Sequence, residues 1–269
     1  MTLAHERQGD GPVAVALLHG VGGSRRIWSD PVSGTARALA QAGFTALALD
    51  LPGYGDSPLP AGLSIASMAQ AVADTLSALG LQQAVLLGHS MGGMVAQELA
   101  AQHPDRVAAL VLACTSPAFG KPGGDWQQAF LRDRLALLDA GQGMAAVAER
   151  LVPAMVAPEV PEAAREAARG IMSAVPEATY RAALHALVCF DRRAGLPAIR
   201  VPTLCLAAAH DRTAPPDVMQ RMAGHIPGAQ YECLEGAGHI ANVEQPEAFN
   251  ATVLAFLRQH FPPNPPCND

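Results

Sequence analysis

The sequence has little charge and few aromatic side chains. Of its 269 residues, 16% are charged and 4% are aromatic, and the formal net charge is -6. Lys and Arg form no block of the kind that follows a phosphate backbone, so we expect no nucleic-acid partner. The N-terminal residues lack a basic stretch followed by an apolar one, and no apolar run approaches the roughly 18 residues of a membrane span. We therefore expect a cytoplasmic protein without a membrane partner.

The cysteines are few, odd in number and widely separated, and no Cys-x-x-Cys pair occurs among Cys114, Cys189, Cys205, Cys233 and Cys267. This pattern argues against a disulfide framework and against a structural zinc site. The glycines of Gly20–Gly23 do not form a phosphate-binding Walker loop, because no Gly-Lys-Ser/Thr follows them. We therefore expect neither a metal ion nor an organic cofactor.

The sequence does contain an alternation of short apolar runs with helical patterns. Half of the residues are hydrophobic, which is enough for a sizeable core in one large domain. Strands that are apolar at almost every position belong to a mostly parallel sheet with helices on both faces. The pattern therefore predicts a doubly wound α/β fold. The predicted strands are Val13–Leu18, Thr45–Leu49, Ala84–Leu87, Val107–Ala113, Thr203–Ala208 and Gln230–Leu234.

Helical patterns connect these strands, and one long helical segment interrupts them. Ser64 is expected to cap a helix over residues 65–79, and Pro246 to begin the last helix. From about Cys114 to Ile199 the alternation stops, and helical stretches rich in Ala, Leu and Met replace it. Such an insertion would cover the carboxyl ends of the strands, where open α/β sheets bind ligands. We therefore expect a core of residues 1–113 and 200–261, a helical cap of residues 114–199 and a flexible tail of residues 262–269.

Residues 88–92 read Gly-His-Ser-Met-Gly at a predicted strand-to-helix junction. A serine hydroxyl is a poor nucleophile unless an oriented base removes its proton and donors face the developing oxyanion. A sharp turn raises such a serine above the sheet and crowds its neighbours, so Gly88 and Gly92 supply the small residues that the turn needs. Ser90 is therefore the predicted nucleophile, and His89 is expected to pack or bond beneath the turn.

Two further residues follow predicted strands and complete a catalytic triad. Asp211 and His239 lie in loops at carboxyl ends of strands, where side chains of different segments converge. Ser90 would attack an acyl carbon, His239 would transfer its proton to the leaving oxygen, and Asp211 would hold the imidazole tautomer. The backbone amide of Met91 and that of Val21, in the loop after an early strand, would bind the oxyanion.

These segments together resemble the α/β-hydrolase superfamily over nearly the whole chain. The resemblance implies an α/β-hydrolase fold with a helical cap inserted after the sixth-strand position. It also implies a serine hydrolase that cleaves a small carboxylic ester or lactone as a monomer or homodimer. The final segment is most similar to 3-oxoadipate enol-lactonases and neighbouring carboxylesterases. The matching segments are His19–Ser24 with Trp28, Asp50–Ser57, Gly88–Gly93, Asp211, Gly238–His239 and Asn242–Phe249.

The chain departs from its relatives in ways that leave the substrate open. Enol-lactonases usually have Leu or Asn where this chain has His89, and an Arg-Trp-Phe-like stretch where it has Leu151–Val156. Carbon–carbon hydrolases share the scaffold but usually follow the catalytic histidine with tryptophan, and here Ile240 follows. Cofactor-free perhydrolases use the same triad, and some members of the fold are ligand receptors. A carbon–carbon hydrolase, a perhydrolase and a receptor thus stay open beside an esterase or lactonase.

The sequence offers pocket residues without fixing their directions. Aromatic residues and methionines at helical spacing also pack as ordinary core. Arg132 and Arg134 are both available to bind a substrate carboxylate, and the sequence does not show which way they face. The candidate pocket residues are Trp28, Trp126, Phe130, Met144 and Ile240.

Overall fold

A seven-stranded sheet forms the centre of the computed structural model, which describes residues 1–120 and 123–262. All neighbouring strands are parallel except the first pair, β1 and β3. The predicted mostly parallel α/β sheet is therefore confirmed. Of the expected tail, residues 263–269 lie outside the described residues. In spatial order the strands are β1 (His5–Gln8), β3 (Thr45–Leu49), β2 (Ala14–Leu18), β4 (Ala84–His89), β5 (Val107–Ala113), β6 (Thr203–Ala208) and β7 (Gln230–Leu234).

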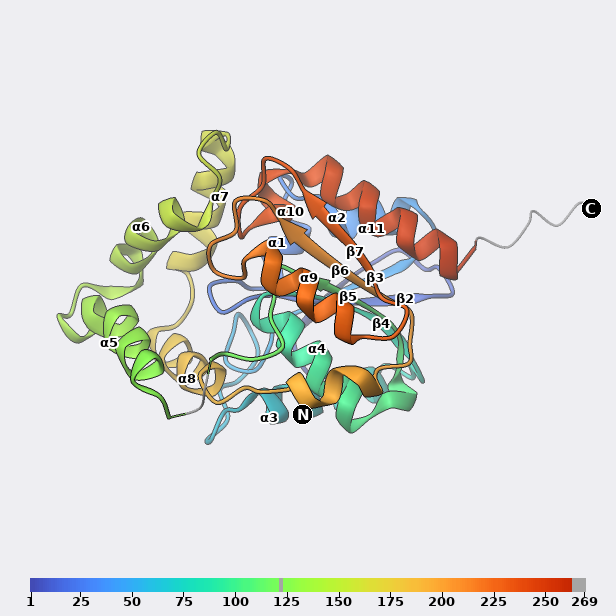
Figure 1. The fold of residues 1–269 in the computed structure, drawn as a ribbon, viewed down its shortest axis with the longest axis horizontal. Coiled ribbons are helices and arrows are strands. Elements are labelled where there is room, and N and C mark those ends of the chain that lie inside the picture. The colour runs from blue at the N-terminus through green and yellow to red at the C-terminus, as the bar shows by residue number, and fades with distance from the viewer. Residues whose placement is uncertain (121–122, 263–269) are drawn as a thin grey trace, which may run out of the picture.

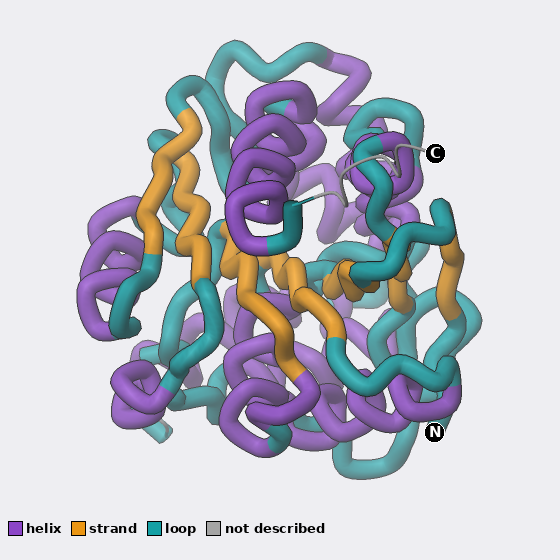
Figure 2. Tube along the Cα trace, turned by 90° about the vertical axis from the view of Figure 1, so that its right-hand side faces the viewer, coloured by secondary structure: helices purple, strands orange, loops and turns teal. Residues whose placement is uncertain are grey.

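Helices cover both faces of this sheet. In Figure 1, α2 and α11 lie above the strands while α3 and α4 lie below, and Figure 2 shows the strands enclosed between helices. No helix in the described part of the chain is long and apolar enough to cross a membrane. The core helices are α1 (Arg26–Ser29), α2 (Thr35–Gln41), α3 (Ile65–Ala78), α4 (Met91–Gln102), α9 (Pro216–His225), α10 (Ala241–Glu244) and α11 (Pro246–His260).

The central strands are buried because their side chains are apolar on both faces. Every residue of β2, β3, β4 and β6 is buried, as expected for parallel strands that helices cover on two sides. The polar edge strand β1 was not predicted, because His-Glu-Arg-Gln shows neither an apolar run nor alternation. Pairing with β3, in which His5 lies opposite Leu49, makes this segment a strand.

Four helices between β5 and β6 form a separate group, and we refer to this group as the cap. It follows β5, the fifth strand of this chain. In Figure 1 the cap lies to one side of the sheet, beyond the ends of the strands. Its helices are α5 (Asp125–Asp139), α6 (Gly143–Met155), α7 (Glu162–Ser173) and α8 (Glu177–Leu187). Two short 3₁₀ turns lie outside these helices, at Pro104–Arg106 before β5 and at Arg193–Ala198 before β6.

Candidate active site

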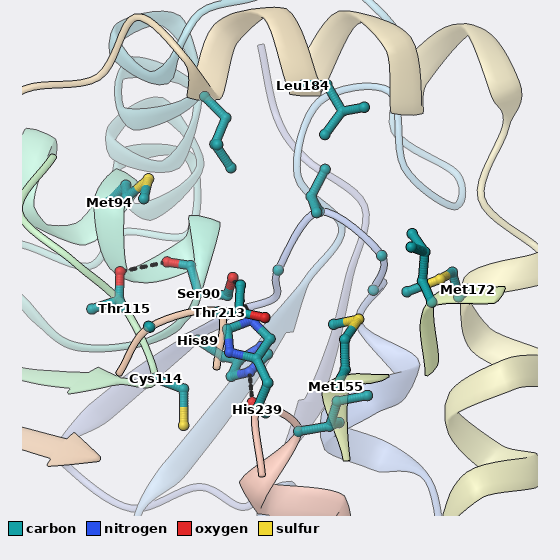
Figure 3. A pocket seen from close by; sticks show the side chains of 18 of the residues that line it. His89, Ser90, Met94, Cys114, Thr115, Met155, Met172, Leu184, Thr213 and His239 are labelled. Carbon is teal, nitrogen blue, oxygen red and sulfur yellow. Dashed lines mark hydrogen bonds between the residues drawn. The ribbon is translucent and has the colours of Figure 1, made fainter. Parts of the chain in front are cut away.

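Ser90 lies at the sharp turn between β4 and α4. Its backbone has φ 53° and ψ −118°, in a region that residues with a side chain seldom occupy. Two hydrogen bonds hold this conformation: the Ser90 N–H donates to the carbonyl of Ala113 (2.9 Å), and the Thr115 hydroxyl donates to the carbonyl of Ser90 (2.7 Å; Figure 3). The turn therefore presents the Ser90 hydroxyl above the sheet at a cost that its neighbours compensate.

The flanking glycines are required by close backbone contacts. A Cβ on Gly88 would lie 2.3 Å from the carbonyl oxygen of Gly92, and a Cβ on Gly92 would lie 2.1 Å from that of Leu18. A Cβ on Gly93 would lie 2.7 Å from the side chain of Thr115. These distances are far below ordinary carbon contacts, so the spacing of glycines around the serine follows from the packing of α4 against β2 and β4.

The three predicted triad residues converge in one hydrogen-bonded line. The Ser90 hydroxyl donates to Nε2 of His239 at 3.0 Å, and Nδ1–H of His239 donates to Oδ2 of Asp211 at 2.8 Å. Asp211 follows β6 and His239 follows β7, and both side chains are buried. Both distances lie within the range in which a base accepts the proton of a nucleophile and a carboxylate orients that base.

Asp211 is held in its ionised form. Burial acts to raise the pKa of this carboxyl group, but the charge of His239 and its hydrogen bond act in the opposite direction. The N–H groups of Thr213 and Ala214 also donate to Oδ1, at 2.7 and 2.9 Å. Together these contacts lower the pKa of Asp211 below its usual value, so a carboxylate faces the imidazole at neutral pH.

The loop after β2 is ordered by a histidine in one tautomer. The Leu51 N–H donates to Nε2 of His19 (3.1 Å), which leaves Nδ1–H to donate to the carbonyl of Gly20 (2.8 Å). Burial lowers the pKa of His19 to about 4, so the ring stays neutral and keeps this pattern. Because Gly20 and Val21 share one planar peptide unit, fixing this carbonyl also fixes the direction of the Val21 N–H.

The two predicted oxyanion donors are next to the serine. Met91 is the first residue of α4, where N–H groups have no acceptor within the helix. Val21 lines the pocket at Ser90, and the Tyr54 hydroxyl donates to its carbonyl oxygen at 3.0 Å. An ideal Cβ on Gly20 would lie 3.1 Å from Cβ of Ser90, so this loop runs directly against the turn. Both residues thus lie next to Ser90.

His89 bonds beneath the turn, as expected, and is not part of the triad line. Its Nε2–H donates to the backbone carbonyl of His239 at 2.6 Å (Figure 3). Burial, followed by the charge of His239, lowers the pKa of His89 to about 3. This neutral ring therefore holds the backbone of His239 from the side of β4.

A mainly apolar pocket leads to Ser90 from the cap. Figure 3 shows Met172 and Leu184 of the cap across the pocket from Ser90, and Met155 of the cap beside His239. The side chains that line the cap side of the pocket include Phe130, Arg134, Leu151, Met155, Ala168, Ile171, Met172, Tyr180, Leu184 and Leu187. Phe130 and Ile240, two of the five candidate pocket residues, are among its lining.

The other three candidates lie elsewhere. Trp28 is fully buried beneath the turn, with its ring 6.5 Å from that of His89 and 6.4 Å from that of Phe249. Trp126 is 59% exposed and does not line the pocket, although its ring packs on Phe130. Met144 is buried in the hydrophobic core instead of facing the pocket. Their residue types made these side chains candidates, but the face that each one presents depends on how the helices pack.

The structure distinguishes the two candidate arginines of α5. Arg134 is half-buried and lines the pocket, whereas Arg132 is exposed and does not. The guanidinium of Arg134 lies 5.2 Å from the ring centre of Phe130. Burial raises the pKa of the Tyr180 hydroxyl, and the charge of Arg134 acts against that rise, so the two groups are neighbours at the cap end of the pocket.

One residue near the site had no predicted role. Glu244 is buried and accepts hydrogen bonds from the loop that carries His239. The available signal was a single acidic residue in the otherwise uncharged stretch of residues 240–245, directly after His239. Among residues 1–120 and 123–262, no group of three or more His, Cys, Asp or Glu side chains is placed to hold a metal ion.

Comparisons with known proteins agree with this fold. The sequence pattern of the alpha/beta hydrolase family matches residues 15–252. A protein of Variovorax paradoxus that bears the name putative carbamate hydrolase RutD is 36% identical over 259 residues, which cover 94% of each chain. A thermophilic esterase from Thermogutta terrifontis with malate bound has a TM-score of 0.86 at 28% identity, covering 96% of this chain and 93% of that one.

A second solved structure has a similar fold. The enol-lactonase from Burkholderia xenovorans LB400 has a TM-score of 0.85 at 27% identity, and the match covers 95% of this chain and 96% of that one. Because the family pattern extends over most of the sequence and the relatives match along nearly their full length, the chain belongs to the alpha/beta hydrolase family.

Proposed function

We propose that the protein is a serine hydrolase that cleaves a small carboxylic ester or lactone through an acyl-enzyme. The observation that carries this proposal is the line from Ser90 through His239 to Asp211, with distances of 3.0 and 2.8 Å, at the end of an apolar pocket. A nucleophile, its base and the group that orients the base are thus in hydrogen-bond contact before any substrate binds.

In this reaction His239 accepts the proton of Ser90 as the hydroxyl oxygen attacks the acyl carbon. The Met91 and Val21 amides donate to the resulting oxyanion, and removal of one such donor typically costs about 3–4 kcal/mol. His239 then protonates the leaving oxygen, and Asp211 stabilises the imidazolium between these steps. A water molecule repeats the sequence on the acyl-enzyme, which releases the acid and restores Ser90.

The pocket supports a small substrate with one polar end. Its volume is about 70 Å³, and most of the side chains of the cap that face it are apolar. Arg134 gives the cap end a positive charge, and none of the ion pairs in the described part of the chain involves it. The structural relatives fit this interpretation, since one is an enol-lactonase and another was solved with malate, a dicarboxylate. We therefore include a free carboxylate among the expected features of the substrate.

Carbamate cleavage is a second candidate, which the names of the relatives favour. Relatives that bear the name putative carbamate hydrolase RutD are 31–36% identical to this chain over at least 92% of its length. The same triad serves this reaction, because attack of Ser90 on a carbamate carbonyl gives a carbamoyl-enzyme that water cleaves. The two candidates differ in the leaving group and in how fast the covalent intermediate is hydrolysed.

Perhydrolases, carbon–carbon hydrolases and receptors make different demands on the site. A perhydrolase needs hydrogen peroxide in place of water at the second step, and a carbon–carbon hydrolase needs a carbon leaving group. A receptor would react at most once, whereas the hydrogen-bonded triad supports repeated turnover. Turnover in water on oxygen esters therefore distinguishes the proposed function from a receptor. Faster reaction with hydrogen peroxide, or faster cleavage of a carbon–carbon bond, would instead favour one of the other two.

The test is the kcat/KM for 3-oxoadipate enol-lactone beside short alkyl esters, aryl esters and an N-unsubstituted carbamate ester. We expect Ser90→Ala to lower kcat/KM on the preferred substrate by at least about 10³-fold. Ser77→Ala, on the distant helix α3, is the matched control and should match the wild type. Retention of more than a few per cent of activity by Ser90→Ala would exclude Ser90 as the nucleophile.

A further inference from the structure

The backbone around the catalytic histidine is held by two acceptors outside the triad. The Gly238 N–H donates to Oε2 of Glu244 at 2.8 Å, and the Ile240 N–H donates to Oε1 of the same side chain at 2.9 Å. Between them, the His239 N–H donates to the carbonyl of Met155 at 2.7 Å. Three consecutive amides are thus satisfied, two by one carboxylate and one by the last residue of α6.

The same carboxylate also binds the cap. Oε2 of Glu244 accepts a third hydrogen bond, at 2.7 Å, from the N–H of Ala157, just after α6. The two segments are in direct backbone contact, because a Cβ on Gly238 would lie 2.6 Å from the carbonyl oxygen of Met155 and 2.7 Å from the Ala157 nitrogen. Glu244 therefore joins the loop of the base to the end of a cap helix.

An acidic side chain and a helix C-terminus lie against the His239 loop at this junction. Glu244 is buried, and no ion pair among the described residues includes it. Burial raises the pKa of Glu244 above its usual value, and its three backbone donors and then the charge of His239 oppose only part of that rise. The C-terminus of α6, which carries partial negative charge, lies against the same loop through the Met155 carbonyl.

We propose that Glu244 is a positioning residue for the base: it holds the His239 loop, ties the cap to that loop and stabilises the imidazolium that forms during catalysis. The inference rests on the proposed function, since it assigns His239 as the base. Its three hydrogen bonds all go to backbone N–H groups outside α10, two on the His239 loop and one just after the cap helix α6. The carboxylate also lies where its charge acts on His239 without contacting the substrate pocket.

The test compares Glu244→Gln with Glu247→Gln. Glu244→Gln keeps the shape of the side chain but removes its charge. It also replaces one of the two accepting oxygens by an NH₂ group, which can only donate. Glu247 is exposed in the first turn of α11 and serves as the matched control. We expect Glu244→Gln to lower kcat by tenfold or more with KM within twofold of the wild type, while Glu247→Gln changes neither. The rate at which a fluorophosphonate labels Ser90 should fall in parallel with kcat.

A purely structural role gives a different result: the melting temperature falls, but the folded fraction keeps the wild-type kcat and the wild-type labelling rate. That outcome, or a loss confined to KM, would overturn the inference. Failure of the fluorophosphonate to label Ser90 in the wild type would instead contradict the proposed function. If Glu244→Gln does not fold, hydrogen exchange in the wild type decides: the amides of Gly238, Ile240 and Ala157 must be protected and must open together, and independent exchange overturns the inference.

Discussion

Replacement of Arg134 by methionine tests whether the cap end of the pocket selects an anionic substrate. Methionine retains an unbranched apolar stem beside Phe130 but removes the guanidinium. The change should therefore leave the pocket shape nearly intact while deleting its positive charge. Substrates that differ only in a distal carboxylate should then lose their difference in rate.

The size of the effect follows from the surroundings of the guanidinium. A hydrogen bond between charged partners contributes about 1.5–3 kcal/mol, which corresponds to roughly 10- to 150-fold in kcat/KM. Arg134 is half-buried, so solvent screens part of its charge. We therefore expect the lower end of that range, about 10- to 30-fold, for an anionic ester, and a change within about threefold for a neutral one.

The assay measures kcat/KM for a half-ester of a small dicarboxylic acid and for a neutral ester of the same length. Arg132→Met is the matched control, because Arg132 is exposed on the same helix two residues away. Equal losses on both substrates in Arg134→Met would refute a role in selecting charge. So would a loss in Arg132→Met as large as that in Arg134→Met, since it would reflect the overall charge of the protein.

Two further predictions concern stability. Gly92→Ala should lower the free energy of unfolding by about 2–4 kcal/mol in chemical denaturation, because its Cβ would lie 2.1 Å from the Leu18 carbonyl. Gly224→Ala, where nothing lies within 4 Å of an added Cβ, should be neutral or stabilising, and similar losses in the two variants would contradict this explanation. For His89, whose pKa falls from 6.5 to about 3 on folding, the unfolded chain binds a proton below pH 6.5 that the native chain does not bind. His89 should therefore lower the free energy of unfolding by up to about 1.4 kcal/mol per pH unit as the pH drops from 6.5 towards 4. In chemical denaturation at several pH values, His89→Gln should show a shallower fall than the wild type. Equal slopes would contradict a neutral His89 in the folded protein.

The parts of the fold that sequence predicts well are those in which local pattern and burial agree. The strands Thr45–Leu49, Val107–Ala113, Thr203–Ala208 and Gln230–Leu234 were predicted with the boundaries that the structure has. Ser64 caps α3 as expected, in a reciprocal pair of hydrogen bonds with Ser67. The strand His5–Gln8 was missed because its structure depends on an edge of β3 and not on its own residues.

The residues of the site also differ in how well the sequence predicts their positions. Gly88, Ser90 and Gly92 have a spacing that only a tight turn explains, so their local geometry could be read from the sequence. The pocket could not, because Phe130 faces it and Trp126 points to solvent although both occupy the same helix. That difference depends on the angle at which α5 packs, which is a property of the assembled cap.

The cap is one uninterrupted stretch of chain, and this has a consequence for how new specificities arise. The groups proposed for bond cleavage come from β2, β4, β6 and β7, whereas most of the wall that faces the substrate lies between β5 and β6. A recombination event with two crossover points could therefore exchange the whole cap, which would change the substrate preference and leave the residues of the triad unchanged. At its contact with the His239 loop, a replacement cap would have to supply little beyond the backbone carbonyl at position 155 and the backbone N–H at position 157. Any residue has the carbonyl, and any residue except proline has the N–H.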